Sequence, residues 1–213
     1  MATYDLDEQE RLDELKAWWK RWGSMVMIGL AVVIAASAGW RYWQHRTLTQ
    51  SLEAAAVYEK LTQSLAANDA KAAREAGSML IDQYKGTAYA PRAAMLLAKL
   101  NVLGKDLKSA QAQLEWAVAN SKEPAVRDLA RLRLAGVLLD QKQYDAALKT
   151  LSATHSDAYA FRFHDAKGDV LLAQGKQAEA RAAYQAAFGK MQEDDPYRTI
   201  VELKLDALGG EAK

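Results

Sequence analysis

The most apolar part of the chain is the uncharged run from Gly23 to Trp40, near the N-terminus. A helix of this length is about 27 Å long, close to the roughly 30 Å hydrocarbon core of a bilayer. We therefore predict one transmembrane helix over residues 23–43, preceded by a cytoplasmic segment at 1–22 and followed by a soluble domain at 47–210.

Aromatic residues flank the apolar run on both sides, and five of the six tryptophans lie in this region. Amphipathic aromatic rings prefer the headgroup level of a bilayer, so two belts indicate anchors at the two membrane interfaces. The predicted anchors are Trp18, Trp19, Trp22, Trp40, Tyr42 and Trp43.

Two alternatives to a retained anchor stay open. A buried helix of a soluble protein is disfavoured by the two aromatic belts. A cleaved signal peptide is suggested by Ala36-Ser37-Ala38, which has the small-x-small form of a cleavage site. Signal peptides begin with a short positive region, however, whereas six acids precede this run, which favours a retained anchor.

Beyond Arg46 the chain reads as successive helices separated by short breaks with turn or capping compositions. Each of the three prolines suits the first turn of a helix, where no amide donor is lost. Alanine is abundant and no segment shows sustained strand alternation, so we expect an all-α chain. The predicted helices are 49–67, 70–84, 89–103, 107–121, 124–140, 144–153, 158–174, 177–191 and 196–208.

The soluble helices show an internal repeat, because the segment 139–147 aligns with 173–181 at the period typical of tetratricopeptide repeats. Small residues and one aromatic residue recur in the later unit in the order typical of these repeats; they are Gly168, Gly175, Ala180, Tyr184 and Ala187. The earlier unit has Ala146 and Ala153 at two of these positions, and a more degenerate copy has Ala110, Leu114 and Ala117. The predicted fold is a right-handed, tetratricopeptide-like helical solenoid, and the alternative is a generic alanine-rich bundle.

A solenoid of this type lines its concave face with the first helix of each unit. Transferring the repeat positions gives three candidate protein-binding residues per unit, with charges that alternate in sign. Such a face is also what an ordinary solvated surface would show. The candidates are Arg92, Met95, Lys99, Asp128, Arg131, Ala135, Arg162, Asp165 and Asp169. The last helix, from Pro196 to Leu208, is expected to cap the final unit, with Gly209-Gly210 as its stop signal.

Composition excludes several functions. The formal net charge of +1 argues against a nucleic-acid binder. The absence of cysteine excludes disulfides, thiol catalysis, cysteine-based zinc sites and a lipid-modified N-terminal cysteine. The three histidines form no catalytic or metal-binding motif, and no phosphate-binding glycine loop is present. We therefore expect a binding or scaffold protein without cofactor, and nominate no catalytic or metal-binding residue.

The predicted orientation in the membrane rests on a small difference in the number of basic residues on the two sides of the span. Four Lys or Arg residues precede the span within about twenty residues, and three follow it. The positive-inside rule therefore favours, by one residue, a cytoplasmic N-terminus with the soluble domain outside the cytoplasm.

The order of these features resembles the ancillary SecYEG translocon subunits (YfgM-like proteins) of Gram-negative bacteria over essentially the whole chain. The acidic and then aromatic-basic opening at 4–23 is the most specific part, followed by the single span, the Ala54-Ala-Ala-Val-Tyr58 segment and the 83–94 junction. This resemblance implies an inner-membrane protein with a cytoplasmic N-terminus and a periplasmic repeat domain.

The resemblance also implies partners: the SecYEG translocon, a PpiD-type periplasmic chaperone, and an envelope-stress response regulator contacted through the cytoplasmic segment. The implied role is to handle newly translocated envelope proteins as an interaction platform. An assembly scaffold for another cell-envelope complex is the alternative function.

Overall fold

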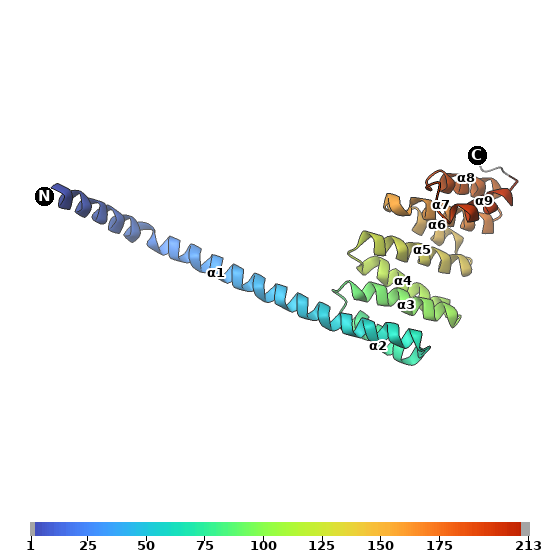
Figure 1. The fold of residues 1–213 in the computed structure, drawn as a ribbon, viewed down its shortest axis with the longest axis horizontal. Coiled ribbons are helices and arrows are strands. Elements are labelled where there is room, and N and C mark those ends of the chain that lie inside the picture. Colours follow the sequence, from blue (N-terminus) through green and yellow to red (C-terminus); the bar gives the residue numbers. More distant parts are fainter. Residues whose placement is uncertain (1–2, 210–213) are drawn as a thin grey trace. The chain divides into compact units, whose positions relative to one another are not determined.

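Helices make up nearly all of the computed structural model, which describes residues 3–209, with side chains described from residue 10 (Figure 1). Residue Gly210, the predicted end of the soluble domain, lies outside the described residues. The chain divides into two compact units between Gln50 and Ser51. The helices are α1 (Thr3–Ala66), α2 (Ala70–Gln83), α3 (Tyr89–Leu103), α4 (Leu107–Asn120), α5 (Pro124–Asp140), α6 (Tyr144–Leu151), the short 3₁₀ helix η1 (Asp157–Tyr159), α7 (Ala160–Ala173), α8 (Gln177–Phe188) and α9 (Arg198–Asp206).

Helix α1 runs without interruption from Thr3 to Ala66, so the predicted separate helix at 49–67 is its C-terminal end. The segment between Gly39 and Ala66 contains no proline or glycine that would end a helix, which explains the continuity. The predicted boundaries at residues 22, 43 and 47 coincide with no break in the helix and stay predictions.

Within residues 10–209, α1 alone has the length and composition to cross a membrane. Only 6% of its most apolar 18-residue window is buried inside the protein, whereas the core helix of a soluble protein would be mostly buried. All of the predicted interface anchors are exposed on α1; they are Trp18, Trp19, Trp22, Trp40, Tyr42 and Trp43.

The second unit stacks its helices in chain order, from the end of α1 through α2 to α9, and its described residues contain no strand (Figure 1). From α2 onward each α-helix packs against the next, and α5 also packs against both α3 and α7. The end of α1 shares a buried cluster with α2, in which Leu61 lies with Leu80. Apart from the start of the first helix, the predicted boundaries lie within three residues of those observed. The all-α prediction is therefore confirmed.

The same type of turn joins the two helices of each pair in this unit. One residue in each turn has a positive φ: Asn68, Lys105, Lys142 and Gly175. The amide of this residue donates a hydrogen bond to the carbonyl three residues earlier, and the next amide donates to the carbonyl five residues before it. This Schellman pattern satisfies the last carbonyls of the first helix and sets where the second helix begins.

The positions of these turns correct the repeat alignment. Lys142 is equivalent to Gly175 and not to Lys176. The offset along the sequence between the last two units is therefore one residue shorter than the sequence alignment indicates. Burial agrees, since Ala147 is fully buried at the position of Ala180, whereas Ala146 is exposed. In the degenerate copy, Ala110 is likewise equivalent to Ala147 and not to Ala146, because both follow their turn residue by the same interval.

Small residues allow the helices of a pair to approach closely, as the repeat pattern predicts. A Cβ atom added to Gly168 would lie 2.4 Å from the ring of Tyr184, which packs on it from α8. The predicted positions Ala110, Leu114 and Ala117 are buried, and so are Ala180, Tyr184 and Ala187. The alanine excess therefore serves close packing as well as helix formation.

Helix α9 closes the last pair, as predicted for residues 196–208. Val201 and Leu205 are buried in a cluster with Tyr184, Ala187 and their neighbours on α8. Gly209 follows α9 with a φ of 75°, the conformation expected of a helix stop. The second glycine of the predicted stop, Gly210, is not among the described residues.

Two glycines in first helices give opposite predictions for stability. Gly168→Ala should destabilise the repeat domain by about 1–3 kcal/mol, because the Tyr184 ring leaves no room for a methyl group. Gly136→Ala should stabilise it by about 0.5–1 kcal/mol, since a Cβ there meets no atom within 4 Å and alanine favours the helix. Urea unfolding of the full chain in detergent, followed by circular dichroism, measures both; two changes of the same sign would contradict this packing.

Candidate protein-interaction groove

The first helices α3, α5 and α7 of successive pairs lie side by side. They border two adjoining open cavities of about 600 and 400 Å³. Arg133 and Gly136 of α5 line both cavities. We name the two cavities together the first-helix groove. Its aliphatic lining is Met95, Ala98, Val102, Leu114, Leu129, Leu132, Ala135, Val137, Leu139, Ala166 and Val170.

The three candidates on α3 occupy different surroundings. Met95 is buried and Lys99 is exposed, and both line the smaller cavity. Arg92 lies outside both cavities. Its guanidinium instead forms two hydrogen bonds of 2.8 and 2.7 Å with the carboxylate of Glu123. This arginine therefore joins α3 to the segment that precedes α5.

The bidentate contact also changes the acidity of both groups. The hydrogen bond from Arg92 lowers the pKa of Glu123, although partial burial opposes this. The hydrogen bond to Glu123 raises the pKa of Arg92 in return. Both groups are therefore charged at neutral pH.

The three candidates on α5 do not form a common exposed face. Asp128 is 2% exposed and lines neither cavity. Ala135 is 1% exposed and lines the larger cavity, at the small-residue packing position that Gly168 has in the next unit. The alignment error of one residue explains the difference, since a one-residue step rotates a helical position by about 100°. With the correct register, the α5 residues equivalent to Arg162, Asp165 and Asp169 are Leu129, Leu132 and Gly136.

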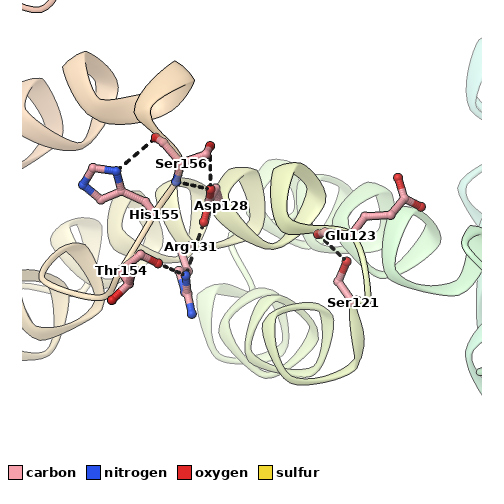
Figure 2. Close-up of polar contacts among 7 residues, drawn as sticks. All are labelled: Ser121, Glu123, Asp128, Arg131, Thr154, His155 and Ser156. Carbon is pink, nitrogen blue, oxygen red and sulfur yellow. Dashed lines mark hydrogen bonds and ion pairs between the residues drawn. The ribbon is translucent and has the colours of Figure 1, made fainter.

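Asp128 and Arg131 instead hold the segment that joins α6 to α7 (Figure 2). One carboxylate oxygen of Asp128 accepts hydrogen bonds of 3.0 Å from both the amide and the hydroxyl of Ser156. Arg131 donates to the other oxygen of Asp128, at 3.3 Å, and to the carbonyl of Thr154, at 2.8 Å. Asp128 and Arg131 therefore have a structural role, which is to hold this linker against α5.

The side chain of His155 belongs to the same linker. Its ring stacks on Phe163 with 4.2 Å between the ring centroids. Its Nδ1 lies 3.2 Å from the carbonyl oxygen of Ser156 (Figure 2). This stacking fixes the linker against α7.

The candidates on α7 are brought together with α9. Nζ of Lys204 lies 2.7 Å from Oδ1 of Asp165 and 2.7 Å from Oδ1 of Asp169. The hydroxyl of Tyr197 donates to Asp165, and that of Tyr184 donates to Asp169, each at 2.8 Å. Asp165 and Asp169 thus dock the capping helix, while Arg162 is exposed at the groove.

These contacts also shift the pKa values of the two phenols and of the Lys204 amine. Burial raises the pKa of Tyr184 and Tyr197, and donation to the two carboxylates raises both pKa values further. Burial alone would lower the pKa of Lys204, but its bonds to Asp165 and Asp169 outweigh this and raise it. Lys204 is therefore charged at neutral pH, and the phenols are neutral donors.

Sequence reasoning missed most of the α5 residues that line the groove. Leu129, Leu132 and Gly136 are displaced by one residue from the nominated positions, and Arg133 is their exposed neighbour. Aligning the left-handed turn residues Lys142 and Gly175 would have found them, but lysine at such a position carries no distinctive signal.

Comparison with known proteins identifies the family. Residues 16–210 match the family model described as a tetratricopeptide repeat-like domain. The ancillary SecYEG translocon subunit of Neisseria gonorrhoeae is 32% identical over 209 residues, which cover 98% of this chain and 100% of that protein. The chain belongs to the ancillary SecYEG translocon subunit family.

Two further members of the ancillary SecYEG translocon subunit family match at lower identity. The protein of Haemophilus influenzae is 28% identical over 87% of this chain and 90% of its own length, and that of Escherichia coli is 28% identical over 87% and 89%. No solved structure matches the chain. The family consists of non-catalytic interaction scaffolds, which confirms the expectation that this protein is not an enzyme.

The contacts of Asp128 predict a large loss of stability on its removal. Asp128→Ala should cost about 2–4 kcal/mol of unfolding free energy, because the Ser156 amide and the Arg131 guanidinium lose a buried charged acceptor. Asp140→Ala, at an exposed position of the same helix, should change stability by less than about 0.5 kcal/mol. Urea unfolding measures both, and limited proteolysis should cleave the 152–159 linker faster only in the Asp128 variant. Equal effects of the two substitutions would refute the structural role of Asp128.

Proposed function

We propose that this chain is a membrane-anchored interaction subunit associated with the SecYEG translocon. The observation that carries the proposal is the similarity to an ancillary SecYEG translocon subunit over 98% of this chain and all of that relative. The first-helix groove gives the family's repeat fold a concave surface of the type with which solenoids bind partners.

A retained anchor in the inner membrane is part of this proposal. The family match starts at residue 16, before the apolar run, and so includes the run within the matched domain. A cleaved signal peptide would not be expected inside it. The slight excess of basic residues before the span supports a cytoplasmic N-terminus and a periplasmic repeat domain.

The finer role is that of a platform for periplasmic chaperones, of the PpiD type, that receive newly translocated envelope proteins. The acidic N-terminal segment is the proposed contact with an envelope-stress response regulator in the cytoplasm. Both statements are supported by the resemblance of the N-terminal region and repeat order, and the groove supplies a surface for the first of them.

Co-purification tests the association. An affinity-tagged full chain, solubilised from its native membranes under conditions that keep the translocon intact, should recover the translocon subunits and a periplasmic chaperone. A tagged single-span membrane protein without a repeat domain is the control. Recovery of other envelope complexes without translocon subunits would favour the alternative function, an assembly scaffold elsewhere in the cell envelope.

The orientation can be tested with single cysteines, because the natural chain has none. Gln185→Cys on α8 and Glu14→Cys on α1 both place a thiol at an exposed position. A membrane-impermeant maleimide should label residue 185 in intact spheroplasts and residue 14 only after lysis. The reverse pattern would place the repeat domain in the cytoplasm and contradict the proposal.

A further inference from the structure

The charges around the first-helix groove are not equally available to a partner. Lys99, Arg133 and Arg162 are exposed, and among the described residues none of the three is within ion-pair distance of a carboxylate. The groove carboxylates Asp165 and Asp169 are instead ion-paired with Lys204. The one exposed carboxylate in the described lining is Asp140.

Arg162 is held in a defined position by two aromatic rings, without an ion pair among the described residues. Its guanidinium carbon lies 5.1 Å from the ring centroid of Phe161 and 5.1 Å from that of Tyr197. Tyr197 is itself fixed, because its hydroxyl donates to Asp165. A guanidinium that stacks on aromatic rings keeps its in-plane N–H donors free, and these match a carboxylate in a bidentate geometry.

Apolar side chains line part of the same cavity as this cation. Leu129, Leu132, Leu139 and Val170 line the same 600 Å³ space as Arg162 and Arg133. Cavities of roughly 300–1,000 Å³ are typical of binding sites that combine an apolar lining with a few polar groups. The groove can therefore bury large apolar side chains of a partner segment. Its unpaired cations can meet carboxylates adjacent to these side chains in the same segment.

We propose that the first-helix groove binds a partner-protein segment in which carboxylate side chains alternate with large apolar side chains. The apolar side chains enter the space lined by Leu129, Leu132 and Val170, and the carboxylates pair with Arg162 and Arg133. Charge complementarity favours this segment over a basic one, because the groove lining and Lys204 together carry four cations and three carboxylates, and two of the carboxylates are already ion-paired with Lys204. This inference rests on the proposed function as an interaction subunit and names the chemistry of its ligand.

Peptide binding to the full chain tests this chemistry. The protein is placed in nanodiscs of zwitterionic lipid, and three fluorescein-labelled peptide probes of equal length are compared by anisotropy: repeats of Leu-Leu-Asp, of Leu-Leu-Ser and of Leu-Leu-Lys. The acidic probe should bind at least tenfold more tightly than the basic one, and its advantage should decrease as salt is raised. Empty nanodiscs correct for adsorption to lipid.

Variants assign the binding to the groove. Arg133→Gln combined with Arg162→Gln should bring the acidic and basic probes within twofold of each other. The matched control, Lys149→Gln combined with Lys190→Gln, removes two exposed cations outside the groove lining and should keep the tenfold preference. Gly136→Trp, which fills the open space at the centre of the groove, should weaken all three probes at least tenfold. Circular dichroism confirms that each variant is folded.

Several results would overturn the inference: no binding of any probe, equal binding of the acidic and basic probes, or equal effects of the groove and control variants. A dimer of the wild-type chain that Gly136→Trp dissociates would also overturn it, since the occupant would then be a second copy. Translocon co-purification is measured in parallel on the same variants. If the wild type recovers the translocon but shows no acidic preference, only the inference fails. If the preference is present without the translocon, only the proposed function fails.

Discussion

One left-handed residue between the two helices of each pair fixes the geometry on which the rest of the repeat domain depends. The hydrogen bonds donated by its amide and by the next amide end the first helix and set the start of the second. Because the turn is the same at Asn68, Lys105, Lys142 and Gly175, the same faces meet in every pair. Small residues such as Ala147 and Ala180 then lie at the contact, and other residues of the first helices α3, α5 and α7 line the groove.

The sequence predicted the helices well because their end signals are local. Asp69 and Asp106 cap the helices that follow them, accepting hydrogen bonds from amides two or three residues along the chain. The repeat register was wrong by one residue because the matching letters, Lys142 with Lys176 and Gln143 with Gln177, outweighed a conformational equivalence. A lysine in a left-handed turn looks like any other lysine in a sequence.

The groove itself could be predicted only in part, because its chemistry depends on contacts between distant residues. Arg92 and Arg162 occupy equivalent positions on first helices, yet Glu123 pairs with the first and two aromatic rings hold the second. The lysine that is ion-paired with both Asp165 and Asp169 comes from α9, which follows α8 along the chain. Sequence periodicity identifies the face of the helix, but only the packed structure shows which charges are free.

Site-specific photo-crosslinking in intact cells tests most directly whether the groove is the surface that meets the translocon machinery. A photoreactive residue is placed at Gly136 in the groove or at Ala146, which is exposed on α6 outside the groove lining. The account predicts adducts with a translocon subunit or a translocon-associated chaperone from position 136, and none from position 146. Adducts from position 146 with none from position 136 would contradict it.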